Sequence, residues 1–145
     1  MIQRIQTIWL LLASIFALLT LRFSFFGYAV TKPLNEMIGE TNIVKFTAFS
    51  SPTILIVSVA VAAASFVAIF LYKDRKRQLL ITSAIAVGAV INIILYLSQM
   101  RTFKEGQYNI SITSIITFLI PLFLLLAARG IWKDEQLVKS ADRLR

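Results

Sequence analysis

Charged residues divide the chain into four uncharged stretches, and the lengths of these stretches constrain the fold more than any other feature. They hold 17, 27, 23 and 23 residues, between Arg4 and Arg22, Lys45 and Lys73, Arg77 and Arg101, and Glu105 and Arg129. The hydrocarbon core of a bilayer is about 30 Å thick and needs roughly 17 to 25 apolar residues as helix. Because lipid offers no partner to unpaired backbone groups, only helices or closed barrels cross it. The sequence therefore predicts an all-α membrane protein, a four-transmembrane-helix bundle with spans at about 5–21, 52–72, 78–100 and 112–128.

The composition narrows the function classes. The chain of 145 residues is 58% hydrophobic and only 15% charged, which is typical of a single membrane domain, 1–145, with short connections. It contains no Cys and no His, so thiol chemistry, histidine acid–base chemistry and Cys/His zinc sites have no ligands or nucleophiles here. All seven carboxylates lie in connecting segments rather than in a span, where an ionisable group would indicate a functional site. We therefore expect neither an enzyme nor a bound cofactor.

The distribution of Lys and Arg predicts the orientation. Ten of the fifteen lie at the N-terminus, in the turn after the second span and in the C-terminal tail, and five lie in the two other connections. The first group is Arg4, then Lys73, Arg75, Lys76 and Arg77, then Arg129, Lys133, Lys139, Arg143 and Arg145. The positive-inside rule then places both termini and the 73–77 turn in the cytoplasm.

The first outer connection, 22–51, is long and has the pattern of paired strands. Its segments 22–31 and 43–49 are rich in β-branched and aromatic residues, and turn-forming residues fill 32–40 between them. We interpret this as a small extracytoplasmic β-hairpin, to which segment 106–112 can add a third strand. The alternative is an irregular loop whose aromatic residues form a belt at the membrane surface.

Small residues recur every fourth position in the second and third spans. The rows are Ala60, Ala64 and Ala68 in one span, and Ala84 and Gly88, followed by Asn92, in the other. Small-xxx-small rows let helices approach closely, and an amide at such a seam can bond across it. The rows are therefore helix-packing candidates. Packing of the two spans on each other is the simpler interpretation, and a docking groove for a partner is the alternative.

The turn after the second span carries the basic residues Lys73, Arg75, Lys76 and Arg77. Such a cluster can bind anionic lipids or an acidic partner, although retention of the turn in the cytoplasm is enough to explain it. Nucleic acid is not an expected partner.

The C-terminal tail, 129–145, has the pattern of a C-terminal amphipathic helix that Gly130 separates from the fourth span. Leu137, Ala141 and Leu144 share one face and Val138 flanks them, while Glu135 and Lys139 are spaced for an ion pair. The predicted docking residues of this tail are Trp132, Leu137, Val138, Ala141, Leu144, Arg143 and Arg145. The alternative is a helix that lies on the bilayer surface with Trp132 at the interface.

The two ends, Met1–Ala13 and Trp132–Arg145, resemble a family of small four-helix inner-membrane proteins of Bacteroidota, catalogued as a domain of unknown function. The resemblance implies a Gram-negative bacterial inner membrane and carries over no functional residue. The long first outer loop is also similar to that of claudin-like four-helix proteins, an analogy of fold alone.

We expect a non-catalytic accessory or scaffold subunit of a larger inner-membrane protein complex, with protein export or membrane-protein insertion machinery as the favoured assembly. Span helices would pack on the partner, and the hairpin and tail would make the polar contacts. The alternative is a small oligomeric membrane transporter or channel, which would normally show charged or broken helices near the midplane. Only Asn92 and Pro121 point that way.

Overall fold

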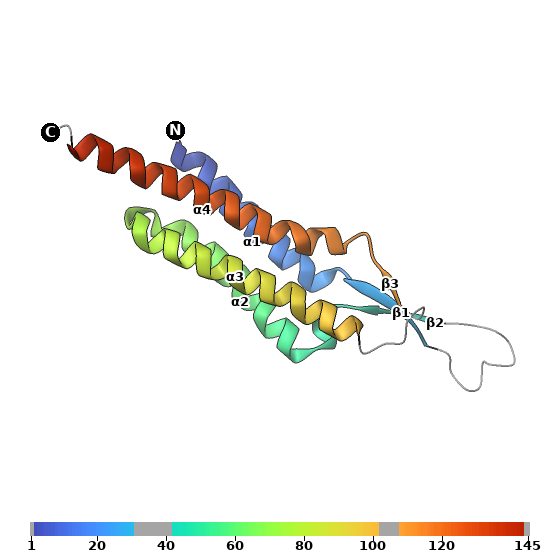
Figure 1. Cartoon of the computed structure of the whole chain (residues 1–145). Helices are drawn as coiled ribbons and strands as arrows, with labels where there is room; N and C mark the ends of the chain where they lie inside the picture. The colour runs from blue at the N-terminus through green and yellow to red at the C-terminus, as the bar shows by residue number, and fades with distance from the viewer. Residues whose placement is uncertain (1, 31–41, 102–107, 144–145) are drawn as a thin grey trace, which may run out of the picture.

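The computed structural model describes residues 2–30, 42–101 and 108–143, and it is mostly helical (Figure 1). Four of its helices are long and apolar enough to cross a membrane. They are α1 (Ile2–Arg22), α2 (Pro52–Phe70), α3 (Arg75–Met100) and α4 (Ser114–Arg143). Two short 3-10 helices, η1 (Ala48–Ser50) and η2 (Leu71–Lys73), precede and follow α2.

The four helices run side by side, with a small sheet at one end of the bundle and both chain termini at the other (Figure 1). We call these the sheet end and the terminus end. Each helix packs chiefly on two neighbours, in the cyclic order α1, α2, α3, α4, and the α2–α3 interface is the smallest of the four. Alanines such as Ala13, Ala62 and Ala89 are buried between the helices, which lets the backbones approach closely.

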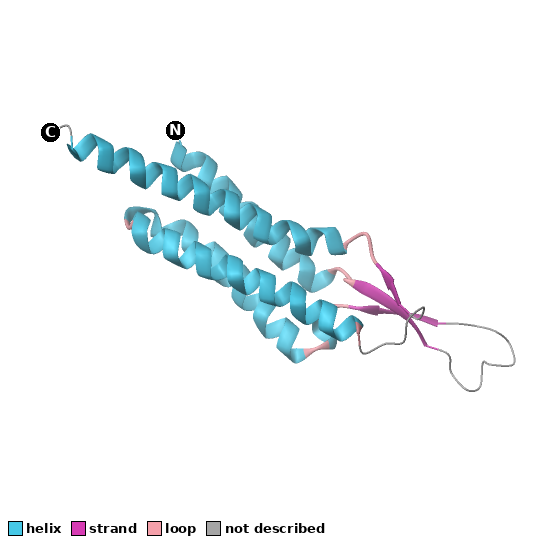
Figure 2. Ribbon diagram, viewed as in Figure 1, coloured by secondary structure: helices cyan, strands magenta, loops and turns pink. Residues whose placement is uncertain are grey.

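The strands at the sheet end are β1 (Phe26–Val30), β2 (Asn42–Phe46) and β3 (Tyr108–Ile110), drawn in magenta in Figure 2. They form one antiparallel sheet in the order β2-β1-β3, with Tyr28 of β1 opposite both Val44 and Tyr108. The hairpin and the third strand that the sequence predicts are therefore confirmed. The predicted turn residues, 32–40, lie outside the described part of the chain.

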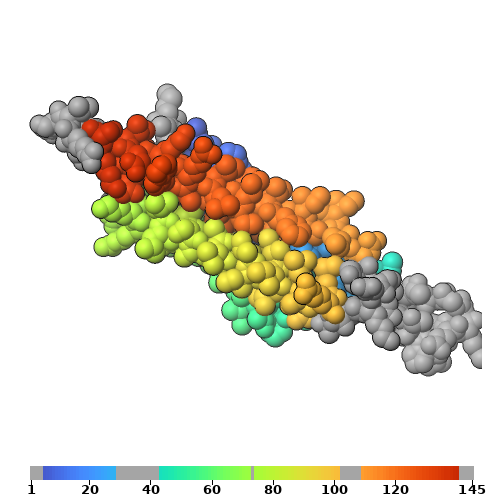
Figure 3. Space-filling model, viewed as in Figure 1, coloured from blue at the N-terminus to red at the C-terminus, as the bar shows by residue number. Residues whose placement is uncertain are grey.

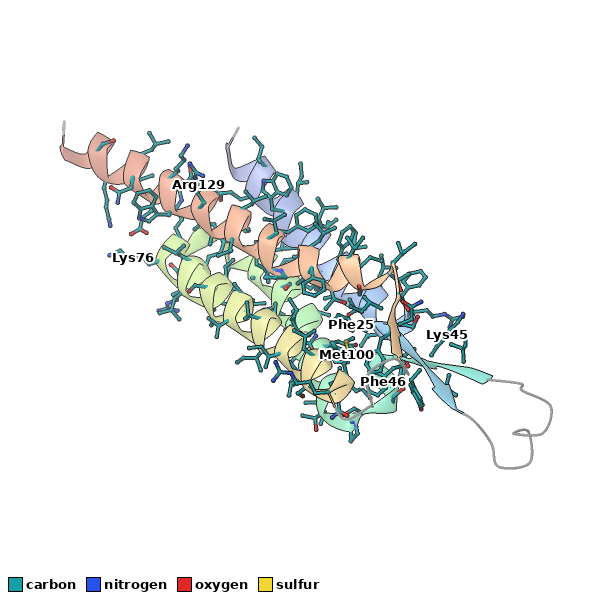
Figure 4. All side chains as sticks on the ribbon, turned by 45° about the vertical axis from the view of Figure 1, so that its right-hand side comes forward. Phe25, Lys45, Phe46, Lys76, Met100 and Arg129 are labelled. Atoms are coloured by element: carbon teal, nitrogen blue, oxygen red, sulfur yellow. The ribbon has the colours of Figure 1, made fainter. Side chains whose placement is uncertain are left out.

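Aromatic side chains join the sheet to the ends of the helices (Figure 4). Phe26 stacks on Phe46 with ring centroids 4.6 Å apart, and Phe25 stacks on Tyr96 of α3 at 4.5 Å. These rings and Met100 are buried and form a second core beneath the sheet. The sheet is thus packed on the bundle. This packing and the third strand stabilise it, because an isolated two-stranded hairpin is only marginally stable in water.

Several element ends differ from the sequence predictions, and three of them are informative. The second strand ends at Phe46 rather than Phe49, because η1 turns the chain into α2. Helix α3 begins at Arg75, three residues before the predicted start, and the side chain of its N-cap residue Asp74 makes no capping hydrogen bond. The fourth helix does not end near Ala128 but continues to Arg143, and this difference determines the shape of the terminus end.

Candidate docking surface on the C-terminal tail

Helix α4 passes through Gly130 without a break, so the prediction that Gly130 separates a span from a distinct tail helix was wrong. The glycine has a different role, which is close approach to α1. A Cβ atom at position 130 would lie 2.9 Å from Cγ of Gln6, nearer than side chains pack. Glycine at a helix contact allows such an approach. Although glycine has a low helix propensity, the helix does not end at this position.

An ion pair fixes α4 to α3 one turn beyond Gly130. One guanidinium nitrogen of Arg75 lies 3.3 Å from a carboxylate oxygen of Asp134 and also donates to the Asp134 carbonyl oxygen at 3.2 Å. Both side chains are largely shielded, 28% and 13% exposed, so water screens this pair less than a surface pair. The pair and the Gly130 contact hold the start of the tail against the ends of α1 and α3.

The tail then continues beyond the helices that cover α4. Leu137 and Val138 follow Gly130 and Ile131 by seven residues, which is two helical turns, and so lie on the same sides of α4. Ile131 is 1% exposed, but Leu137 and Val138 are 54% and 44% exposed. The side of α4 that is buried at Ile131 is therefore exposed at Val138, toward the terminus end, where α4 projects past α3 (Figure 3).

The remaining predicted tail residues take different places. Trp132 is half exposed but lies about a third of a turn away from the Ile131–Val138 side, so it does not share that face. The predicted Glu135–Lys139 pair is confirmed, with a carboxylate oxygen 2.9 Å from the ammonium nitrogen. Arg143 is the last residue of α4. The side chains of Ala141 and Arg143, and residues Leu144 and Arg145, lie outside the described part of the chain.

The basic turn and the tail meet in a cleft of about 660 Å³, which the sequence did not predict. It is lined by Asp74, Arg75, Lys76, Arg77, Glu135, Val138 and Lys139. Of the four basic residues in the turn, Arg75 forms the ion pair with Asp134. A guanidinium nitrogen of Arg77 lies 3.6 Å from a carboxylate oxygen of Asp74, and this pair is mostly exposed. Lys76 points away from the bundle (Figure 4), and the side chain of Lys73 is not described.

The two small-residue rows face each other across α2 and α3 but are unequally buried. Ala68 is fully buried and Asn92 is 2% exposed, whereas Ala64 and Gly88 are half-buried and Ala60 and Ala84 are exposed. Between the rows lies an open apolar groove of about 450 Å³, lined by Ile56, Val57, Ala60, Val61, Ala64, Leu80, Ile81, Ala84, Ile85 and Gly88. A Cβ at Gly88 would meet only Val61, at an ordinary 3.6 Å.

Asn92 bonds across the α2–α3 seam, as its pattern predicts: its amide nitrogen donates to the Ser58 hydroxyl at 3.0 Å. Sequence reasoning missed a second polar contact, in which the Gln78 amide donates to the Ala68 carbonyl oxygen at 3.0 Å. It also missed Gln6 and the Arg75–Asp134 pair. The only signal for Gln6 was its position as an uncharged polar residue at the edge of a span. The Arg75–Asp134 pair gave no local signal, because 59 positions separate the two residues in the sequence.

The helices and their arrangement define a class: a bundle of four helices compatible with a multi-pass membrane protein, closed at one end by a small sheet. The family comparison agrees with the resemblance noted above. Residues 2–144 match the family described as "Domain of unknown function (DUF4293)", and the chain belongs to that family. No curated protein and no solved structure matches the chain.

The Arg75–Asp134 pair can be tested by exchanging its charges. We expect Arg75→Asp or Asp134→Arg alone to raise the rate of chymotrypsin cleavage within 132–143 about tenfold, because losing a charged hydrogen bond costs about 1.5–3 kcal/mol. The double exchange should restore much of the protection. Arg101→Asp, at an exposed position of the sheet end, serves as the control and should leave the rate unchanged. Equal cleavage in all variants would show that the pair does not hold the tail.

Proposed function

We propose that this protein is a multi-pass protein of the bacterial inner membrane and a non-catalytic accessory subunit of a larger membrane complex. Its tail is the surface that contacts the partner. The observation that carries the proposal is the exposure of Val138 on a side of α4 that is buried at Ile131, next to the exposed Leu137. The positive-inside bias supports a cytoplasmic location for the terminus end, where this surface lies.

The position of the tail relative to the bilayer follows from the contacts at the terminus end. Gln6 beside Gly130 and Arg75 beside Asp134 place polar and charged groups of three helices at one level, as expected at a membrane interface. Nine further residues reach Arg143, which extends the helix roughly 14 Å beyond Asp134. A continuous helix held in this way stands off the bilayer, so its apolar side chains are not inserted among lipids.

Such a surface suits a protein partner. Leu137 and Val138 offer apolar area, while Lys133 of the tail and Lys76 of the adjoining cleft offer positive charge near it. Charged groups at the rim of an interface steer association and fix its register. We therefore infer a partner with an apolar patch flanked by acidic groups. The favoured assembly is machinery for protein export or membrane-protein insertion.

A transporter or channel is the alternative, and one observation favours it. Two buried polar atoms make no hydrogen bond within the described residues: Nε2 of Gln6 and Oγ1 of Thr82. Buried polar groups normally have partners, and bound water can supply them. A water path through the bundle would account for these atoms.

The docking surface is tested by removing the tail without disturbing the contacts of the bundle. Truncation after Gln136 keeps Gly130, Ile131 and Asp134, and it should leave the thermal stability of the purified protein nearly unchanged. Co-purification of partner proteins with the tagged protein should fall at least tenfold. Val138→Glu should have most of this effect, because it places a charge on a surface that is dry when bound.

Gln136→Glu is the matched control. It introduces the same charge two residues away, on the side of the helix opposite Val138, two turns after the exposed Arg129. We expect it to leave co-purification intact. If the truncated protein retains its partners in full, the tail is not the docking surface and the transporter hypothesis gains support.

The orientation can be tested separately, because the chain has no native cysteine. In intact spheroplasts, an impermeant thiol reagent should label cysteines introduced at the exposed positions Lys45 and Asn109. Cysteines at the exposed positions Lys76 and Ser140 should be labelled only after the membrane is opened. Labelling of Lys76→Cys or Ser140→Cys in intact spheroplasts would contradict the proposed orientation.

A further inference from the structure

We propose that the groove between α2 and α3 binds one anionic phospholipid from the leaflet at the terminus end. One acyl chain occupies the groove, and Arg77 holds the headgroup phosphate. This inference rests on the proposed membrane insertion but not on the docking of the tail.

The groove is a place that hydrocarbon must fill. It is almost entirely apolar, and it lies along the α2–α3 interface, which is the smallest of the four interfaces between neighbouring helices. In a bilayer, water does not occupy such a groove stably, because it finds no polar partners there. Leaving about 450 Å³ empty would forfeit the packing that joins membrane helices. A flexible acyl chain can enter such a space from the surrounding lipid without any rearrangement of the helices.

The charge at the end of the groove selects the lipid. Arg77, Ile81, Ala84 and Gly88 are spaced by four, three and four residues, which places them on one face of α3. Ile81, Ala84 and Gly88 line the groove. Arg77 precedes Ile81 by about one turn and lies toward the terminus end. The Arg77 side chain is 79% exposed, so it is accessible to a headgroup.

The dimensions agree with a single leaflet. Arg77 and Gly88 are separated by eleven residues of helix, roughly 16 Å along the axis. Half of a hydrocarbon core of about 30 Å is roughly 15 Å. A phosphate at Arg77 therefore places the end of an acyl chain near Gly88, where a side chain is absent.

The contact of Arg77 with Asp74 does not prevent this binding. The two groups are 3.6 Å apart and both are mostly exposed, so their attraction is weak and can be replaced by a phosphate. Lys76, which also points outward, adds a second positive charge near the same headgroup (Figure 4).

The test is native mass spectrometry of the full chain in mild detergent, titrated with phosphatidylglycerol or phosphatidylcholine. We expect one tightly held phosphatidylglycerol, with an affinity at least fivefold above that of phosphatidylcholine. Arg77→Gln should reduce the phosphatidylglycerol affinity about fivefold, which corresponds to the contribution of one basic residue. Ala84→Leu should reduce the affinity of both lipids, because its side chain fills the groove.

Two matched controls accompany these variants. Ala63→Leu makes the same exchange at an exposed position of α2 that does not line the groove, and Arg101→Gln removes a charge at the sheet end. Both should bind phosphatidylglycerol like the original protein. Gly88→Leu provides a second groove-filling variant, since its Cβ has room.

Three results would overturn the proposal. Displacement of the lipid by inorganic phosphate would show a phosphate site without a role for the groove. Unchanged lipid binding in both Ala84→Leu and Gly88→Leu would show that the acyl chain lies elsewhere. Loss of a dimer in these two variants, with lipid binding intact, would show that the groove is an interface between two copies of the chain.

Discussion

The contact of α4 with the ends of α1 and α3 is the constraint on which the terminus end depends. Gly130 lets α4 approach Gln6, and Asp134 then meets Arg75 one turn further along. Without these contacts, the apolar side chains of the tail would be free to turn toward the bilayer, as amphipathic helices do. With them, α4 is one continuous helix that runs past the bundle to Arg143. The exposure of Leu137 and Val138 is a consequence of that continuation.

The two ends of the bundle are stabilised in different ways, which suits different roles. Stacked rings of Phe25, Phe26 and Phe46 close the sheet end, and Tyr96 of α3 takes part in the same core. Aromatic burial of this kind contributes both apolar area and specific ring contacts. At the terminus end, the polar side chains of Gln6, Arg75 and Asp134 take part in the contacts between helices. The two proposed binding surfaces, the tail for a protein and the α2–α3 groove for a lipid, both lie toward this end.

Much of the fold follows from local sequence, because the spacing of charges and the alternation of 22–31 and 43–49 each depend on neighbouring residues. The spans and the hairpin were predicted on that basis. Gly130 was misinterpreted because glycine near the end of an apolar run usually ends a helix. Its actual reason is a contact with Gln6, more than a hundred positions earlier in the chain. The Arg75–Asp134 pair and the stacking of Phe25 on Tyr96 are equally non-local, and composition gives no signal for such pairings.

The continuity of α4 is the most direct test of this account. The distance between spin labels on cysteines introduced at Ile115 and Ser140, both exposed, can be measured by pulsed electron–electron double resonance in lipid nanodiscs. A helix that passes straight through Gly130 separates the two positions by roughly 38 Å. A tail that bends at Gly130 to lie on the bilayer surface brings them to roughly 27 Å. We predict a single narrow distribution near the longer distance; a distribution centred on the shorter one would contradict the account.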